Sequence, residues 1–176
     1  MKRITTILSL LMLVCMGAWA QEVIADGEYY QICLGANTNV GTANNGTRYV
    51  SATGRQATHF RDAASYKLIA VGDYYYIQEK FTSKYLGCDK TQVDADMASG
   101  SYSRNSSTIV LQDLPETDDD KQYFQWQITL AANSTNVYLI KPRPYSSLSL
   151  AVFTIGDSFF CLFKSGTVCY FAVYEP

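Results

Sequence analysis

The chain has 176 residues, a mass of 19.6 kDa and a net charge of −2 at pH 7. A mildly acidic chain lacks the basic face that sequence-independent nucleic-acid binding requires, so we expect no nucleic-acid partner. Aromatic residues make up 14% of the sequence and charged residues only 17%, a composition that excludes intrinsic disorder. The length fits one domain with a sizeable core.

The first twenty residues have the pattern of a secretory signal peptide. The pattern comprises a positive start at Lys2 and Arg3, an apolar run at residues 7–16 and a small-x-small site at Ala18-Trp19-Ala20. We predict a signal peptide over residues 1–20, cleaved after Ala20, and a secreted or periplasmic domain over residues 21–176. Cys15 suggests a lipoprotein signal as an alternative, which the bulky Val14 before it disfavours. No later apolar run reaches the roughly 18 to 20 residues of a spanning helix, so we expect no membrane span.

Four cysteines remain after the leader, and export would place them where disulfides form. They are Cys33, Cys88, Cys161 and Cys169. Cys161 and Cys169 flank a turn at residues 164–167. They either face each other across a hairpin or are two separate buried thiols, and the sequence favours neither alternative. Four cysteines allow three pairings, so Cys33 and Cys88 have no assigned partner.

The rest of the chain has the pattern of short β-strands. Fourteen Tyr and eight Phe lie in short alternating runs that Gly, Asn, Asp and Ser interrupt. No segment after the leader places apolar residues at the i, i+3, i+4 and i+7 spacing of an amphipathic helix. We therefore predict an all-β domain.

A threefold repeat underlies the strands, with copies at about residues 26–70, 71–131 and 132–176. Each copy opens with a polar turn, two bulky residues, a variable residue and isoleucine. The openings are Gly27-Glu28-Tyr29-Tyr30-Gln31-Ile32, Gly72-Asp73-Tyr74-Tyr75-Tyr76-Ile77 and Thr135-Asn136-Val137-Tyr138-Leu139-Ile140. Later strands are expected at residues 48–50, near 58–60 and 66–68, then 84–86, 109–111 and 124–126, then 148–150, 159–162 and 171–173. One four-stranded unit cannot bury its own apolar face, so we expect three units to close a small barrel.

The repeat also predicts which side chains fill that barrel. The expected core layers are Tyr30, Tyr75 and Tyr138, then Ile32, Ile77 and Ile140, then Leu68, Trp126 and Val173. The middle copy is the longest, and most of its excess lies in the polar stretch Asp89 to Thr108. We predict a loop insertion there, because loops absorb added length at little cost.

Three four-stranded repeats with these openings resemble the β-trefoil, and within it the ricin-type lectin-like domains. The segments that carry the resemblance are Asp26-Gly27-Glu28-Tyr29-Tyr30-Gln31-Ile32, Tyr75-Tyr76-Ile77, Lys84-Tyr85-Leu86-Gly87 and Phe124-Gln125-Trp126-Gln127-Ile128. Such domains have a Gln-x-Trp signature in the fourth strand. This chain keeps Trp126 but has Phe124 at the Gln position. The resemblance implies a secreted, non-catalytic module that binds a glycan or polysaccharide.

The resemblance further implies a sugar site on one repeat, made of an Asp after the second strand, an aromatic platform and an amide before the core Trp. Sugar hydroxyls need directional hydrogen bonds, and the apolar face of the sugar ring lies on an aromatic ring. Only the middle copy offers all three. The candidate carbohydrate-binding residues are Tyr85, Asp89, Tyr102, Asp120 and Gln122. The alternative is that Asp89, Asp120 and Gln122 are solvated loop residues.

Metal and catalytic patterns are weaker, so we predict no metal, no cofactor and no enzyme activity. Asp94-Ala95-Asp96 loosely matches a calcium loop, but Ala98 and Asn105 stand where that loop needs oxygen ligands. Asp118-Asp119-Asp120 is typical of a solubilising loop. His59 is the single histidine, and no nucleophile turn of the Gly-x-Ser-x-Gly kind accompanies it.

A protease inhibitor is the second hypothesis, with a secreted protease as partner, because β-trefoils also present rigid loops to enzyme clefts. The expected loop is either the stretch Asp89 to Thr108 or the proline-flanked Lys141-Pro142-Arg143-Pro144. Proline restricts loop conformations and lowers the entropic cost of binding. The alternative role of Pro142 and Pro144 is to block edge pairing.

Overall fold

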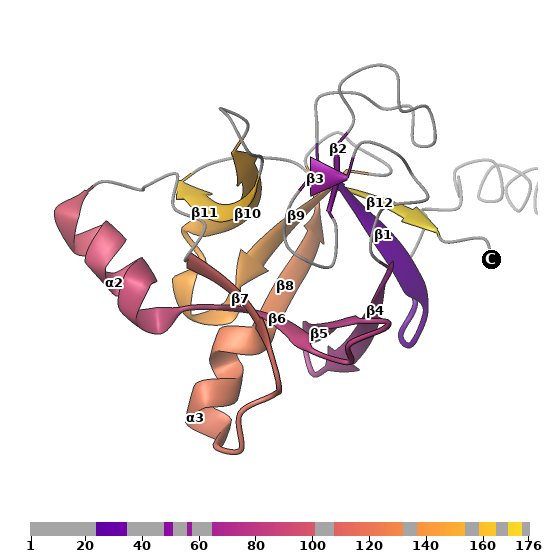
Figure 1. The fold of residues 1–176 in the computed structure, drawn as a ribbon, viewed down its shortest axis with the longest axis horizontal. Helices are drawn as coiled ribbons and strands as arrows, with labels where there is room; N and C mark the ends of the chain where they lie inside the picture. The colour runs from indigo at the N-terminus through magenta and orange to yellow at the C-terminus, as the bar shows by residue number, and fades with distance from the viewer. Residues whose placement is uncertain are drawn as a thin grey trace, which may run out of the picture.

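A computed structural model describes residues 24–34, 48–50, 56–57, 65–100, 108–131, 137–153, 159–164 and 169–173. The predicted leader, His59 and Tyr102 lie outside the described residues. Most of the described chain is β-strand (Figure 1). The strands are β1 (Tyr29–Leu34), β2 (Arg48–Val50), β3 (Gln56–Ala57), β4 (Ser65–Val71), β5 (Tyr74–Glu79), β6 (Tyr85–Cys88), β7 (Ile109–Gln112), β8 (Gln125–Leu130), β9 (Val137–Pro142), β10 (Leu148–Phe153), β11 (Phe159–Lys164) and β12 (Cys169–Val173).

Six strands form a closed antiparallel ring. β1 pairs with β4, β4 with β5, β5 with β8, β8 with β9, β9 with β12, and β12 returns to β1. The register places Tyr30 opposite both Tyr66 and Val173, so β1 is paired on both sides. Every strand of the ring has two neighbours, and closure removes the exposed edges that an open sheet would present.

The other six strands form three hairpins, one in each repeat. β2 pairs with β3, β6 with β7, and β10 with β11. Each repeat therefore gives two strands to the ring and two to a hairpin, which confirms the predicted architecture of three four-stranded units. The third strand of the first repeat is Gln56–Ala57, slightly before the expected position.

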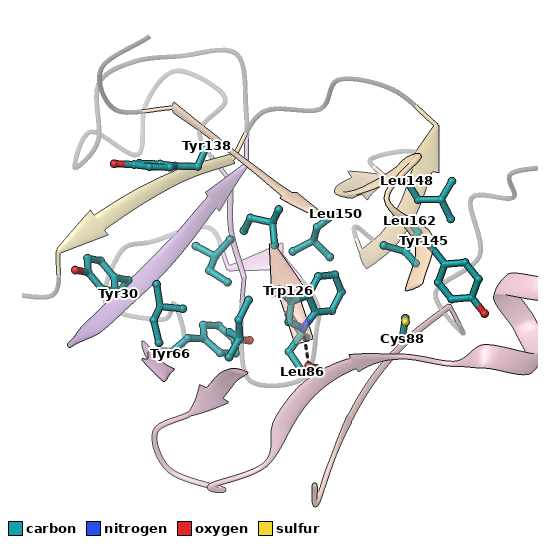
Figure 2. Packing of buried hydrophobic residues seen from close by; sticks show 14 of the residues in the cluster. Tyr30, Tyr66, Leu86, Cys88, Trp126, Tyr138, Tyr145, Leu148, Leu150 and Leu162 are labelled. Carbon is teal, nitrogen blue, oxygen red and sulfur yellow. Dashed lines mark hydrogen bonds between the residues drawn. The ribbon is translucent and has the colours of Figure 1, made fainter. Parts of the chain in front are cut away.

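Branched and aromatic side chains fill the ring (Figure 2). Ile32, Ile77, Ile140, Leu68 and Trp126 are all fully buried. The indole Nε1 of Trp126 donates a hydrogen bond of 2.8 Å to the backbone oxygen of Leu86, which ties the ring to the β6–β7 hairpin. Buried polar groups need such a partner.

One predicted core position is wrong. Tyr30 and Tyr138 are buried, but Tyr75 is only half-buried and packs against the edge of the core. Tyr75 is the second residue of β5, directly after the β4–β5 turn, where solvent reaches the end of the ring. Tyr66, opposite Tyr30 on β4, is 1% exposed and is a core residue that the repeat pattern did not assign.

The described part of the long middle segment is helical, so the predicted loop insertion is wrong there. α2 spans Lys90–Ser99, with Asp89 as its N-cap and Gly100 as its C-cap at a φ of +67°. The caps and polar side-chain pairs stabilise this helix, since Val93 is its one buried residue. A search for apolar periodicity therefore misses it. Shorter helical turns are α3 (Asp118–Lys121), η3 (Gln122–Phe124) and η4 (Arg143–Tyr145).

Of the two alternatives left open for Cys161 and Cys169, the hairpin is wrong. β11, which carries Cys161, pairs with β10, whereas β12, which carries Cys169, pairs with β1 and β9. Cys88 is a free, buried thiol whose Sγ donates to the backbone oxygen of Tyr123 at 3.3 Å. Among the helices of the described segments, none is long and apolar enough to cross a membrane.

Candidate functional site

A cleft of about 310 Å³ lies beside the β6–β7 hairpin of the middle repeat. Three segments that are far apart in the sequence form its walls: the end of β6 with the start of α2, the strand β7, and the α3–η3 turn. Figure 1 shows β6 and β7 running between α2 and α3. The lining residues are Cys88, Asp89, Lys90, Thr91, Val110, Gln112, Pro115, Asp120, Tyr123 and Phe124.

The strand alternation of β6 explains why a cleft forms on this side of the hairpin. Leu86 and Cys88 are buried in the core, so the neighbouring positions Tyr85 and Gly87 lie on the opposite face of the strand, where Gly87 is itself buried. A Cβ atom at Gly87 would lie 2.4 Å from Cε1 of Phe124. The ring of Phe124 therefore lies directly on the Gly87 backbone, a close approach that only glycine permits.

Asp89 is held at one wall by its role as a helix cap. Its Oδ1 accepts a hydrogen bond of 2.8 Å from the backbone nitrogen of Gln92. Its Oδ2 has no hydrogen-bond partner among the residues that the structure describes, so this oxygen remains available to a ligand. The position of Asp89 after the second strand of the repeat is therefore fixed by α2.

Asp120 repeats this arrangement at the opposite wall. Thr117 caps α3, its hydroxyl donating to Oδ2 of Asp120 at 2.6 Å and accepting from the Asp120 backbone nitrogen at 3.2 Å. Oδ1 of Asp120 makes no hydrogen bond within the described segments. Both carboxylates are thus oriented through one oxygen, while the other oxygen is free to accept from a ligand.

Cationic and amide groups complete the polar rim. Lys90 forms an ion pair of 2.8 Å with Asp94, and the hydrogen bond to Asp94 raises the pKa of Lys90 above its usual range. Asp94 also accepts a hydrogen bond of 2.7 Å from the hydroxyl of Tyr145. The hydrogen bonds from Lys90 and Tyr145 lower the pKa of Asp94, so this carboxylate stays ionised and keeps Lys90 at the rim. Gln112 adds an exposed amide from the end of β7.

Tyr123 is the aromatic residue of the cleft. It is half-buried, its ring lies 6.1 Å from that of Tyr145 at an angle of 44°, and its backbone oxygen accepts from Cys88. The Tyr145 ring packs against the Tyr123 ring, and the hydrogen bond from Cys88 holds the Tyr123 backbone. Tyr123 precedes the core residue Trp126 by three positions, and that spacing is the one signal in the sequence that would have identified it.

The structure brings together two of the five predicted site residues, Asp89 and Asp120. Gln122 is not part of the lining, because its Nε2 donates to the backbone oxygen of Asp119 at 2.7 Å. Tyr85 is on the same face of β6 as Gly87 but is not part of the cleft lining. Tyr102 falls outside the described residues and stays a prediction.

Sequence reasoning missed Lys90, Gln112 and Tyr123. Lys90 is the first residue of a helix that was not predicted, and Gln112 directly follows the strand expected at residues 109–111. Asp94 and Asp96, which loosely match a calcium loop in the sequence, belong to helix α2. Within the described segments no group of three or more His, Cys, Asp or Glu side chains is arranged to hold a metal ion.

Both segments proposed as inhibitory loops have regular structure. The described part of the stretch Asp89 to Thr108 is mostly helix α2. Lys141 and Pro142 end the strand β9, and Arg143 begins the turn η4. Pro142 is buried opposite Trp126, so neither described segment is a protruding loop.

Comparison with known proteins gives no match to any family model and none to any curated protein. Solved structures do match. A Culex quinquefasciatus salivary protein of the Cysteine and Tryptophan-Rich family is 15% identical, with a TM-score of 0.57 and coverage of 88% of this chain and 98% of the other. The BEL beta-trefoil is 14% identical, with a TM-score of 0.51 and coverage of 87% and 97%.

A third match is a Polyporus squamosus lectin, solved with the epitope Neu5Acα2-6Galβ1-4GlcNAc. It is 13% identical, with a TM-score of 0.52 and coverage of 86% of this chain and 50% of the lectin. The chain is a β-trefoil. At such low identities the likeness establishes the fold of this trefoil, while its ligand has to be argued from its own cleft.

Proposed function

We propose that this trefoil is a non-catalytic carbohydrate-binding module that holds a sugar in the cleft beside β6–β7. The observation that carries the proposal is the pair of carboxylates, Asp89 and Asp120. Each is anchored through one oxygen by a helix cap and has its second oxygen free of described partners. Sugar hydroxyls can donate hydrogen bonds to these oxygens. Because both carboxylates are already oriented, binding loses no side-chain entropy at them.

The remaining lining supplies the other contacts that a sugar needs. Lys90 and Gln112 can donate hydrogen bonds from the rim, and Tyr123 offers a ring for the apolar face of the sugar. A volume of about 310 Å³ is at the lower end for ligand sites, which favours one or two sugar units. We expect millimolar binding, worth about −4 kcal/mol.

The fold match to a lectin supports this proposal, because that protein was solved with a bound glycan epitope. The predicted leader supports the proposal that the module is secreted or periplasmic, where glycans and polysaccharides are found. The inhibitor hypothesis has no comparable support, because both of its loop candidates have regular structure where they are described.

The test is a glycan array followed by calorimetric titration of the strongest binder. Asp120→Asn removes one cleft carboxylate, whereas Asp119→Asn is the matched control, because Asp119 is the exposed neighbour outside the lining. We expect Asp120→Asn to weaken binding about tenfold, as the loss of a charge-assisted hydrogen bond does, and Asp119→Asn to leave it unchanged. Equal effects of both variants, or binding by neither wild type nor variants, would reject the cleft. New reducing ends in the mixture would reject the non-catalytic assignment.

A further inference from the structure

A second polar and aromatic surface lies outside the cleft, on strands β5, β6 and β8 and the turn η4. Each of its side chains contacts the next one in the group, and we name this group the arginine row. It consists of Tyr74, Arg143, Gln125, Tyr76 and Tyr85.

Arg143 is an exposed residue that the row holds in one orientation. Its Nη1 donates to Oε1 of Gln125 at 2.5 Å, and its guanidinium lies 5.1 Å from the centre of the Tyr74 ring. Pro142 and Pro144 flank it and restrict its backbone. Holding a long charged side chain this way costs rotamer entropy, so a ligand that meets Arg143 would meet a preorganised group.

Gln125 connects the arginine to the next aromatic residue. It is 7% exposed, and its Nε2 donates to the hydroxyl of Tyr76 at 3.0 Å while its Oε1 accepts from Arg143. Both ends of this buried amide are therefore used inside the row. Gln125 acts as a positioning residue for Arg143 and Tyr76.

The guanidinium has no counter-ion within the described part of the chain. Arginine carries five N–H donors in a fixed fork, and only one described acceptor, Gln125, receives a hydrogen bond from Arg143. The geometry that such a fork matches best is a carboxylate, which it binds through two parallel hydrogen bonds. An acidic ligand therefore fits this end of the row.

The other end of the row offers ring faces and leads to the cleft. Tyr76 and Tyr85 are half-buried, with ring centres 5.9 Å apart at an angle of 78°. Tyr85 is the register partner of Gln112, which lines the cleft. The arginine row and the cleft thus meet at the β6–β7 hairpin.

We propose that the arginine row is a second saccharide subsite, in which Arg143 binds the carboxylate of an acidic sugar such as a uronic acid, and Tyr76 and Tyr85 contact its ring. This proposal rests on the proposed function for the saccharide class. Its carboxylate contact, however, can be measured without any ligand in the cleft.

The experiment uses NMR of the whole domain during titration with glucuronate, glucose or acetate, and it follows one signal that every variant keeps, the backbone amide of Gln125 beside Arg143. We expect glucuronate to shift this signal with an affinity about tenfold higher than either glucose or acetate, because only glucuronate offers both carboxylate and ring. Arg143→Gln should abolish the preference for glucuronate over glucose, and Tyr85→Ala should remove the preference over acetate. Lys67→Gln makes the same charge change on β4 and should alter neither preference.

Three results would overturn the subsite. The first two are glucuronate binding no tighter than glucose, and a preference for glucuronate over glucose that survives Arg143→Gln. The third, acetate binding as tightly as glucuronate, would indicate a simple carboxylate site, such as an acidic protein would use. Thermal unfolding of each variant verifies that it is folded. The subsite and the cleft can fail separately. Glucuronate binding at Arg143 with no neutral sugar in the cleft rejects the proposed function alone, and the reverse rejects the subsite alone.

Discussion

The inner and outer faces of the β6–β7 hairpin show how one strand serves two purposes. On the inner face, Leu86 and Cys88 are buried against the ring, and Trp126 donates to the Leu86 carbonyl. On the outer face, the ring of Phe124 lies directly on Gly87 and lines the cleft. Successive residues of a strand point to opposite sides, so a residue that stabilises the core is followed directly by one that faces the binding side. We therefore expect inner substitutions to change mainly the free energy of unfolding, and outer ones to change sugar binding as well.

The largest effect is expected on the inner face, from Trp126→Ala. This side chain is fully buried in the ring, and its loss leaves a cavity and an unpaired Leu86 carbonyl. The expected destabilisation is about 3–5 kcal/mol, measured by urea unfolding. Trp126→Phe keeps much of the volume and should cost less. Equal stability of wild type and Trp126→Ala would show that the ring is not the core.

Gly87→Ala tests the outer face at its closest contact. The new methyl would meet the Phe124 ring at 2.4 Å, so we expect a loss of about 1–3 kcal/mol in unfolding free energy together with weaker sugar binding. The double variant with Phe124→Leu should recover part of the stability, because the smaller side chain can move. An additive double variant would mean that these residues do not touch.

The buried thiol of Cys88 makes the free energy of unfolding depend on pH in the alkaline range. Burial raises the pKa of Cys88 from its ordinary value of 9.0 to about 12. Above pH 9 the unfolded chain releases a proton that the native chain retains, so the free energy of unfolding falls, by about 1 kcal/mol between pH 9 and 10. Burial also raises the pKa of Tyr66 and Tyr145 above that of free tyrosine, so measurements stop at pH 10. Cys88→Ala should reduce this fall, and an unchanged pH slope would contradict the buried thiol.

The smallest expected change in stability is at Asp89, where it separates helix capping from sugar binding. Asparagine caps helices as well as aspartate does, so Asp89→Asn should change the unfolding free energy by only a few tenths of a kcal/mol. Asp89→Ala loses the cap to Gln92 and should cost about 1 kcal/mol. Both variants should weaken sugar binding, because both remove the carboxylate. Normal binding by Asp89→Asn would assign Asp89 to the helix alone.

The fold could be predicted from the sequence because its cause is local and repeated. The isoleucine in the opening of each copy, Ile32, Ile77 or Ile140, is fully buried in the ring in every repeat. The signal failed where packing is not periodic. Helix α2 has one buried residue and is stabilised by its caps, so it has no apolar stripe. Tyr75 follows the pattern but lies at the end of the ring.

The site was harder to predict, because it joins side chains by tertiary contact. Asp89 and Asp120 were found as carboxylates in the middle copy, yet the helix caps that orient them are invisible without α2 and α3. Tyr123 depends on its contacts with Cys88 and Tyr145, which come from other elements. Arg143 was noticed only as part of a proline-rich stretch. Its significance comes from Gln125 and Tyr74 across the strands.

Amide NMR of the domain during titration with a mixture of neutral oligosaccharides locates the ligand without any substitution. A sugar in the cleft should shift the backbone signals of Asp89 to Gln92, of Gln112 and of Asp120 to Phe124, and should leave strands β1 and β4 unchanged. Shifts confined to β1 and β4, or no shift with any saccharide, would contradict a sugar site on the outer face of the middle repeat.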